Sequence, residues 1–181
     1  MRQDAFAKQR ELSDRHWWWR GRRKIIASLF DRMDIPEGAD ILEMGCGDGS
    51  SLPTLAQYGT VYASDINENI LNIAALRKAA TVERGSLPYD IPFDERLFDV
   101  ILLPDVLEHL DDENTSLKAI SRRLKKDGYL LIMVPAYDWL WSGLDDMADH
   151  KRRYTVSRLK KVCRDAGFHV EYSSYFNSVL F

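Results

Sequence analysis

Three glycines, Gly45, Gly47 and Gly49, alternate with other residues and begin two positions after the acidic residue Glu43. Glycine has no Cβ and adopts positive φ angles, so such a stretch turns tightly and lets a ligand come close to the backbone. A helix-like segment begins at Ser50, and the first N–H groups of a helix are unpaired and carry partial positive charge. The stretch predicts a loop that binds a nucleotide-like ligand, although a glycine-rich turn without a ligand has the same composition.

A second carboxylate, Asp65, follows the apolar run at residues 60–64 and lies 16 residues after Gly49. In nucleotide-binding folds a carboxylate at the end of the second strand accepts hydrogen bonds from the ribose hydroxyls. We expect Asp65 to bind a ribose in this way. The alternative is a helix N-cap for a segment that starts near Asn67.

A third group of reactive side chains follows the apolar run at residues 98–103 and comprises Asp105, Glu108 and His109. A general base, a metal site and a purely structural role all fit these residue types. Only two of the three side chains would share one helix face, and no second cluster in the sequence has to complete a set of ligands. We therefore expect no metal and consider His109 as a catalytic base.

The segment 135–153 combines aromatic residues with a basic cluster that includes His150. Its 19 residues are many for a loop without regular structure, so the segment is expected to be functional or partly helical. Guanidinium groups match carboxylates and phosphates, and His150 is suited to act as a base. The alternative is a solvated basic turn with Tyr154 in the core. The acceptor-binding residues expected in and next to this segment are Trp139, Arg152, Arg153 and Tyr154.

Three consecutive tryptophans precede a basic cluster near the N-terminus. Adjacent side chains on a helix or strand point in different directions, so three neighbouring indoles cannot all enter one core. The segment is either a packing helix or a lid over the ligand, in which Arg22 or Arg23 meets a ligand carboxylate and Trp18 contacts the acceptor. We divide the chain into an N-terminal arm with its helix at 1–34 and a main domain at 35–181.

Short apolar runs alternate with amphipathic segments through the rest of the chain, which is typical of parallel strands joined by helical crossovers. The expected strands are 40–44, 60–65, 81–84, 98–103, 129–134 and 168–175. The expected helices are one that ends near residue 34, then 50–57, 67–79, 112–126 before Gly128, and 156–166. This pattern predicts an α/β fold, with a Rossmann-like, doubly wound, mostly parallel sheet that carries helices on both faces.

Length and composition restrict the class of protein. At 181 residues one domain with a sizeable core is expected, and the formal net charge of −3 argues against a nucleic-acid partner. Two cysteines, Cys46 and Cys163, do not suggest a disulfide framework. The charged N-terminus lacks the apolar core of a signal peptide, and no apolar run reaches the roughly 18 residues of a membrane span. We expect a cytoplasmic protein without a membrane span.

The glycine stretch resembles motif I of the class I S-adenosylmethionine-dependent methyltransferases, E/D-x-G-x-G-x-G. Dinucleotide folds use G-x-G-x-x-G instead, and Ser50 stands where that pattern needs glycine. Residues 104–110 resemble the family's D-V-L-E-H segment, and residues 16–18 and 150–155 resemble a branch with an H-W-W arm and an H-R-R-Y-T segment. The resemblance implies S-adenosylmethionine as cofactor and methyl transfer to a small acceptor, for which a cell-envelope sugar or a lipid-linked intermediate is one class.

The resemblance also implies roles for particular residues. Glu43 would support the glycine turn or reach the cofactor's amino group, and Asp65 would hold the ribose. The family often carries Gly-Asp where this chain has Gly85-Ser86, so adenine binding would fall to Ser86 and the backbone of Leu87. The cofactor-binding residues expected from the resemblance are Glu43, Gly45, Gly47, Gly49, Asp65, Ser86, Leu87 and Asp105.

One feature departs from the family pattern. The family's sheet ends in an antiparallel seventh strand, for which no residues remain after the expected strand at 168–175. An unpaired edge favours self-association, so a homodimer through the C-terminal edge is expected. Two other functions stay open: a nucleotide-dependent oxidoreductase, which the glycine spacing disfavours, and a cofactor-binding module without turnover.

Overall fold

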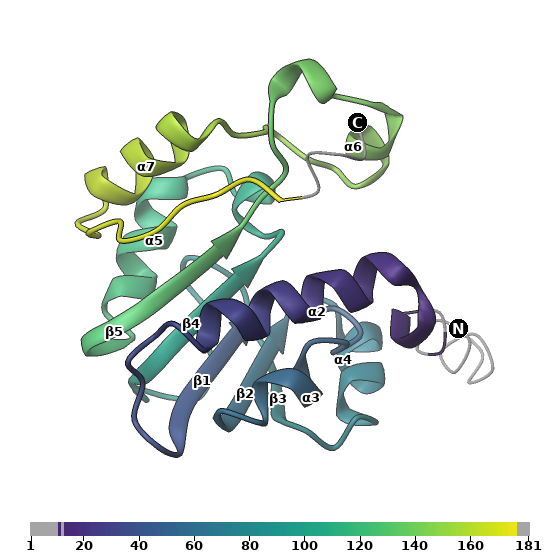
Figure 1. The fold of residues 1–181 in the computed structure, drawn as a ribbon, viewed down its shortest axis with the longest axis vertical. Coiled ribbons are helices and arrows are strands. Elements are labelled where there is room, and N and C mark those ends of the chain that lie inside the picture. The colour runs from purple at the N-terminus through teal and green to yellow at the C-terminus, as the bar shows by residue number, and fades with distance from the viewer. Residues whose placement is uncertain (1–10, 12, 177–181) are drawn as a thin grey trace.

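The computed structural model describes residue 11 and residues 13–176, and its centre is one sheet of five parallel strands in the order β3-β2-β1-β4-β5 (Figure 1). The strands are β1 (Ala39–Met44), β2 (Gly59–Asp65), β3 (Thr81–Arg84), β4 (Phe98–Pro104) and β5 (Leu124–Met133). The helices are α2 (Trp17–Phe30), α3 (Leu52–Leu55), α4 (Glu68–Ala75), α5 (Glu113–Ser121), α6 (Gly143–Met147) and α7 (Val156–Asp165). The predicted α/β, Rossmann-like fold is confirmed.

The central strands pack against a hydrophobic core on each face of the sheet. On β1, Ile41 enters the core that α2, α3 and α4 cover, while its neighbour Leu42 enters the core that α5 and α7 cover. On β4 the same alternation places Val100 and Ile101 in opposite cores. A strand buried on both faces reads as a continuous apolar run, which is why these strands could be predicted from the sequence.

The order of the strands reverses direction at the centre of the sheet. The chain passes from β1 outward to β2 and β3, then returns to the other side of β1 with β4 and β5. In open α/β sheets ligands bind in the crevice that such a reversal leaves outside the carboxyl ends of the strands. The carboxyl ends of β1 and β4 are therefore the place where a ligand is expected.

The helix predicted at 112–126 is shorter than expected, and this prediction was wrong at its end. Helix α5 ends at Ser121, and β5 already begins at Leu124. The Arg123 side chain donates hydrogen bonds to backbone carbonyls of the preceding loop, including that of Pro92 at 2.8 Å. Gly128 does not end a helix but lies inside β5, where a Cβ would come within 3.0 Å of the Asp99 carbonyl oxygen.

The strand predicted at 168–175 is absent, since residues 168–176 form no regular secondary structure. Phe168 and Val170 still pack against the core on the α5 and α7 side. Burial of alternate side chains thus resembles a strand, but no ladder of hydrogen bonds joins this segment to β5 within the described chain.

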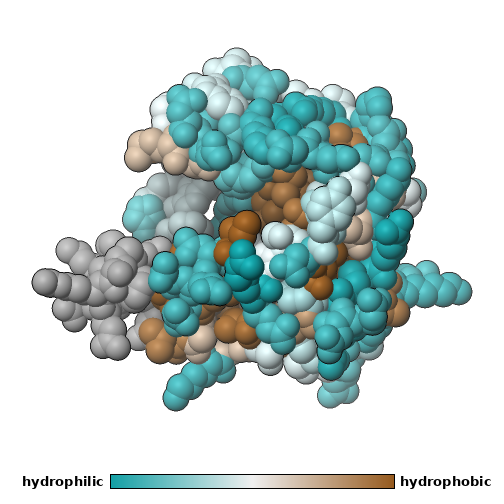
Figure 2. All heavy atoms as spheres, turned by 180° about the vertical axis from the view of Figure 1, so that it is seen from behind, coloured by the Kyte–Doolittle hydropathy of each residue, from teal (hydrophilic) through white to brown (hydrophobic). Residues whose placement is uncertain are grey.

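The connection between β5 and α7 is partly helical, as predicted, because it contains the 3-10 turn Asp138–Leu140 and α6. Seen from behind, the surface is hollowed between the upper part of the molecule, which holds this connection, and the lower part, and apolar side chains lie inside the hollow (Figure 2).

Within the described residues, no helix has the length and apolar character needed to cross a membrane.

Candidate functional site

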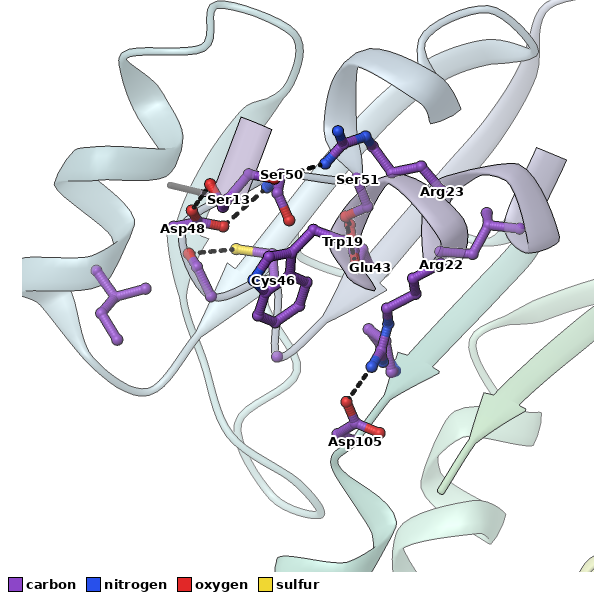
Figure 3. A pocket seen from close by; sticks show the side chains of 15 residues that line it. Ser13, Trp19, Arg22, Arg23, Glu43, Cys46, Asp48, Ser50, Ser51 and Asp105 are labelled. Atoms are coloured by element: carbon purple, nitrogen blue, oxygen red, sulfur yellow. Dashed lines mark hydrogen bonds and ion pairs between the residues drawn. The ribbon is translucent and has the colours of Figure 1, made fainter. Parts of the chain in front are cut away.

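A pocket of about 300 Å³ lies at the carboxyl ends of β1 and β4, where the strand order reverses (Figure 3). It brings together the glycine turn after β1, the end of β4 and one face of α2. The residues that line it are Ser13, Trp19, Arg22, Arg23, Ile26, Glu43, Gly45, Cys46, Gly47, Asp48, Ser50, Ser51, Ile70, Pro104 and Asp105. Of the expected cofactor residues, Gly49, Asp65, Ser86 and Leu87 lie outside this lining.

The three glycines of the turn all have positive φ angles, but their surroundings differ. A Cβ on Gly45 would lie 2.4 Å from the Val106 side chain, and one on Gly49 would lie 3.0 Å from the Ala74 Cα. A Cβ on Gly47, where φ is +53°, would have no atom within 4 Å. Gly45 and Gly49 therefore permit close packing of the turn, whereas Gly47 faces open space at the pocket.

Asp65 ends β2 beside the glycine turn and is tied to it by hydrogen bonds. The Gly47 N–H donates to one carboxylate oxygen at 3.0 Å, and the Asn67 N–H donates to the other at 2.9 Å. The helix N-cap is Asn67 itself, whose side chain accepts a hydrogen bond from the Asn69 N–H. Each oxygen of a carboxylate can accept more than one hydrogen bond, so the half-buried Asp65 keeps acceptor capacity for a diol.

Glu43 lies at the floor of the pocket and is 2 % exposed. The Ser51 hydroxyl donates to its carboxylate, with oxygen–oxygen distances of 2.6 and 2.7 Å. Burial raises the pKa of Glu43 to about 7, while the Ser51 hydrogen bond and the Arg22 charge oppose that rise. A carboxylate held at this position can pair with an ammonium group of a ligand, and the ligand's charge would favour the ionised form.

Replacing Glu43 by glutamine is expected to stabilise the ligand-free protein at alkaline pH. The raised pKa means that the native state binds a proton more tightly than the unfolded chain, so stability falls as pH rises from about 4.5 to about 7. Glu43→Gln should remove that fall and raise the free energy of unfolding at pH 8 by about 3 kcal/mol. Urea unfolding of both proteins at pH 5 and pH 8 measures the effect, and an unchanged pH dependence in the variant would contradict it.

Helix α2 covers the pocket from the side of the glycine turn. Arg22 is 8 % exposed and forms an ion pair with Asp105, which directly follows β4. The guanidinium of Arg22 also lies 6.0 Å from the centroid of the Trp19 ring, which lines the same pocket. Trp18 is not part of the lining and packs edge-on against Trp17 at 5.9 Å. Among the three tryptophans, Trp19 therefore faces the pocket.

Arg77 links the segment before α2 to the glycine turn through hydrogen bonds and ion pairs. Its Nε donates to the Asp48 carbonyl at 2.9 Å, and its guanidinium pairs with Asp14 at 2.7 Å and lies 3.4 Å from the Asp48 carboxylate. The side chain of Arg77 is only 6 % exposed. In the sequence, Arg77 follows Ile73 and Ala74 at helical spacing, on the face expected to point inward. This spacing was the signal that could have identified Arg77 as a residue that holds the glycine turn in place.

The expected adenine-binding residues lie in the loop after β3. Ser86 and Asp90 form an isolated antiparallel bridge, with backbone hydrogen bonds of 2.7 and 3.0 Å. Leu87 packs against the core on the α5 and α7 side. The Gly85 N–H donates to the Asp65 carbonyl at 3.2 Å, which places this loop next to the end of β2.

Glu108, His109 and His150 come together just beyond β4. Glu108 and His109 belong to the 3-10 turn Leu107–His109, and His150 follows α6. The two imidazole rings lie 4.9 Å apart between centroids, and the His150 Nε2 lies 4.0 Å from a Glu108 carboxyl oxygen. Burial, and secondarily the charge of Asp105, raise the pKa of Glu108 to about 8.

Most of the other residues expected at the acceptor site form contacts within the chain that stabilise the connection between β5 and α7. Tyr154 is 2 % exposed, and its hydroxyl hydrogen-bonds to the Glu113 carboxylate at 2.5 Å. Arg152 pairs with Glu113 at 3.1 Å, and Arg153 makes a two-pronged pair with Asp145 at 2.8 Å for each contact. This pair and its hydrogen bonds hold the pKa of Asp145 well below its usual range. Trp139, in contrast, is 75 % exposed.

Comparison with known proteins places this geometry in a family. The family described as "Methyltransferase domain" matches residues 18–173. The chain belongs to this methyltransferase family. A Mycolicibacterium smegmatis protein described as a probable S-adenosylmethionine-dependent methyltransferase is 26% identical over 164 residues, which are 88% of this chain and 62% of that protein. The chain thus spans less than two thirds of that relative.

One further relative agrees with this assignment, and one solved structure shares the fold. The Neisseria meningitidis ubiquinone biosynthesis O-methyltransferase is 26% identical over 192 residues, covering 91% of this chain and 81% of that protein. The structure of an S-adenosylmethionine-dependent methyltransferase from Aquifex aeolicus superposes with a TM-score of 0.66 at 20% identity, covering 95% of this chain and 91% of that chain. The family decides against the oxidoreductase alternative, and S-adenosylmethionine is the cofactor of the class.

The charged groups of the pocket fit the methionine end of S-adenosylmethionine, which carries an ammonium and a carboxylate. Glu43 and Asp48 offer carboxylates to the ammonium, and Arg22 and Arg23 offer guanidinium groups to the carboxylate. Gly47 leaves room for the ligand next to the turn. When bound, the cofactor supplies a methyl group on a sulfonium, which is an activated leaving group. The chain's own residues would then orient that group and exclude water.

Proposed function

We propose that this methyltransferase transfers the methyl group of S-adenosylmethionine to a small acceptor. The observation that carries the proposal is the pocket at the carboxyl ends of β1 and β4, which is lined by the open Gly47 backbone, the buried Glu43 carboxylate and the Arg22 guanidinium. We assign Glu43, Gly45, Gly47, Gly49, Asp65 and Asp105 to cofactor binding, with Ser86 and Leu87 on the adenine side.

We infer that the acceptor enters from the hollow beneath the connection that carries α6 (Figure 2). His109 and His150 lie together beyond the end of β4, on the same edge of the sheet as the pocket, and we assign them to contact the acceptor's reacting atom. Trp139 is exposed on the connection and offers a face for an apolar or sugar ring. Arg152 and Arg153 are ion-paired within the chain, so their contribution is to shape this wall of the site.

The acceptor class is the finer part of the proposal. The relative from Neisseria meningitidis is named an O-methyltransferase, which favours an oxygen nucleophile in this chain too. The H-W-W arm and the H-R-R-Y-T-like segment, together with exposed Trp139, favour a cell-envelope sugar or a lipid-linked intermediate. A homodimer through the C-terminal edge stays a prediction; β5 lies at the edge of the described sheet, and light scattering in solution checks it.

Turnover tests the proposal. The full chain is incubated with S-adenosylmethionine labelled in the methyl group and with sugar nucleotides, lipid-linked sugars and phenols as separate acceptor classes. We expect S-adenosylhomocysteine to form together with a labelled product for at least one hydroxyl-bearing class. Binding of S-adenosylhomocysteine without turnover on any acceptor would instead support a binding module that has lost activity.

A further inference from the structure

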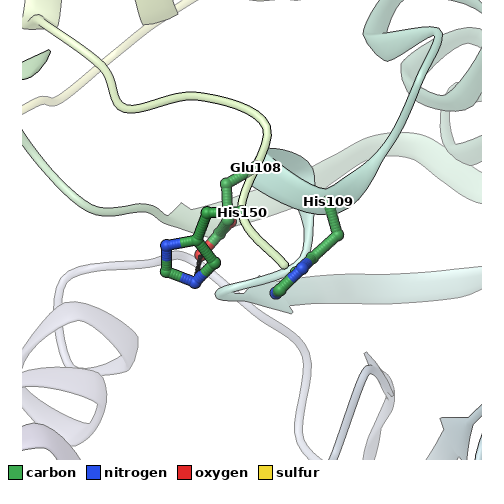
Figure 4. Close-up of side chains that lie close together, drawn as sticks. All are labelled: Glu108, His109 and His150. Carbon is green, nitrogen blue, oxygen red and sulfur yellow. Dashed lines mark ion pairs between the residues drawn. The ribbon is translucent and has the colours of Figure 1, made fainter. Parts of the chain in front are cut away.

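The cluster of Glu108, His109 and His150 is built from two segments that are distant in the sequence (Figure 4). One ligand-type atom from each side chain lies within 4.8 Å of the others. Glu108 is fully buried, whereas His109 and His150 are half-buried. The cluster therefore has a closed side formed by Glu108 and an open side formed by the two imidazoles.

Glu108 is a buried carboxyl group that lacks the usual partners. Its exposed fraction is 0 %, and neither of its oxygens accepts or donates a hydrogen bond within the described residues. Buried carboxyl groups in proteins are nearly always hydrogen-bonded, paired with a cation or bound to a metal. The His150 Nε2 lies 4.0 Å from one of the two carboxyl oxygens, too far for a direct hydrogen bond. A positive group between these atoms would satisfy the carboxylate.

Each histidine uses its Nδ1 for a polar contact with an oxygen atom outside the cluster. The His109 Nδ1 lies 3.3 Å from the Asp149 backbone carbonyl, which can only accept, so this nitrogen carries the proton. The His150 Nδ1 lies 2.9 Å from the Asp145 carboxylate, which Arg153 keeps ionised. In the neutral form of each ring, Nε2 is then the nitrogen with the free lone pair. Metal-bound histidines typically donate their second N–H to a carboxylate or backbone carbonyl, which is the arrangement found here.

We propose that Glu108, His109 and His150 bind a divalent first-row transition ion. Two imidazole nitrogens with one carboxylate suit Zn²⁺, Fe²⁺, Co²⁺ or Mn²⁺ better than the all-oxygen preference of Mg²⁺ and Ca²⁺. Metal bonds of about 2.0–2.2 Å would hold the three ligand atoms about 3.0–3.5 Å apart. The atoms now lie within 4.8 Å of one another, so side-chain rotations that close them by up to about 1.5 Å would complete the site. This site departs from the sequence expectation of no metal, because His150 supplies the ligand that the D-V-L-E-H segment alone did not have.

The ion would sit where the proposed acceptor reacts. Glu108 lies three residues after Asp105, which lines the cofactor pocket, and the open side of the cluster leaves coordination positions free. A bound ion lowers the pKa of a coordinated hydroxyl. The acceptor O–H then loses its proton to solvent, its oxygen pair forms the bond to the methyl carbon, and the methyl–sulfur pair stays on sulfur in S-adenosylhomocysteine. This role rests on the proposed function, whereas the ion site itself does not.

A Co²⁺ titration of the chelator-treated full chain tests the site directly, because cobalt bound by nitrogen and oxygen ligands absorbs visible light. We expect saturation at one equivalent and displacement of Co²⁺ by Zn²⁺. Glu108→Gln and His150→Ala should each weaken Co²⁺ binding at least about 100-fold. His169→Ala, which removes an exposed histidine outside the cluster, is the matched control and should leave binding unchanged.

Binding of S-adenosylhomocysteine to the same variants separates the ion site from the proposed function. Retained affinity shows that Glu108→Gln and His150→Ala are folded, so their loss of Co²⁺ binding supports the site. Where one of them fails to fold, His109→Ala provides the same test. No stoichiometric Co²⁺ binding, or Co²⁺ binding that the variants leave intact, overturns the ion site even if the cofactor binds. A wild-type chain that binds Co²⁺ but not S-adenosylhomocysteine would overturn the proposed function and leave the ion site standing.

Discussion

Replacing Asp65 by alanine is expected to weaken S-adenosylhomocysteine binding by about 100-fold or more. In the proposed function the carboxylate accepts both ribose hydroxyls, and hydrogen bonds to a charged group contribute about 1.5–3 kcal/mol each. The same carboxylate also accepts the Gly47 N–H at 3.0 Å, so the variant loosens the glycine turn as well. Isothermal titration calorimetry of the wild type and the variant measures the change.

Two controls make this result specific to Asp65. Asp34→Ala removes an exposed aspartate in the loop after α2 and should leave the affinity unchanged. Asp65→Asn keeps the size and part of the acceptor capacity, and an intermediate loss is expected. An Asp65→Ala protein that is folded and binds with wild-type affinity would show that the ribose lies elsewhere.

Alanine in place of Gly49 is expected to destabilise the fold, whereas alanine in place of Gly47 is expected mainly to weaken cofactor binding. At Gly49 the new Cβ would lie 2.7 Å from the Leu52 side chain and 3.0 Å from the Ala74 Cα, and φ is +71°. Overpacking and the left-handed conformation together should lower the free energy of unfolding by about 3 kcal/mol. Urea unfolding measures this loss.

Gly47→Ala should change binding far more than stability. The new Cβ meets no protein atom within 4 Å, so only the positive φ of +53° opposes folding, at about 1 kcal/mol. The Cβ would instead occupy space beside the turn that the cofactor needs, and the affinity for S-adenosylhomocysteine should fall at least 10-fold. Equal destabilisation of the two variants, or a Gly47→Ala protein that binds normally, would contradict the idea that Gly47 faces the ligand.

The features that the sequence could predict are those that depend on neighbouring residues. The strand, glycine turn and acid at residues 41–49 specify one another locally, and Asp65 ends the next strand, so both positions followed from pattern alone. The strands buried on both faces were visible as apolar runs for the same reason. The family assignment confirmed the cofactor class that these local motifs indicated.

The features that the sequence could not predict depend on contacts between distant residues. Arg123 turns away from the helical path to reach carbonyls some 30 positions earlier, such as that of Pro92, and α5 therefore ends early. His150 joins Glu108 and His109 only because the connection after β5 folds back over β4, where the Lys151 N–H donates to the Glu108 carbonyl at 2.9 Å. Tertiary contacts of this kind leave no periodicity in the sequence.

The most direct test of the central claim is a calorimetric titration of the full chain with S-adenosylhomocysteine, beside a titration with NADH. We expect micromolar binding of one S-adenosylhomocysteine per chain and no binding of NADH, because the turn after β1 has the glycine spacing of a methyltransferase and the pocket carries groups for both charges of the methionine end. A folded protein that binds NADH, or that does not bind S-adenosylhomocysteine, would contradict the assignment of this pocket.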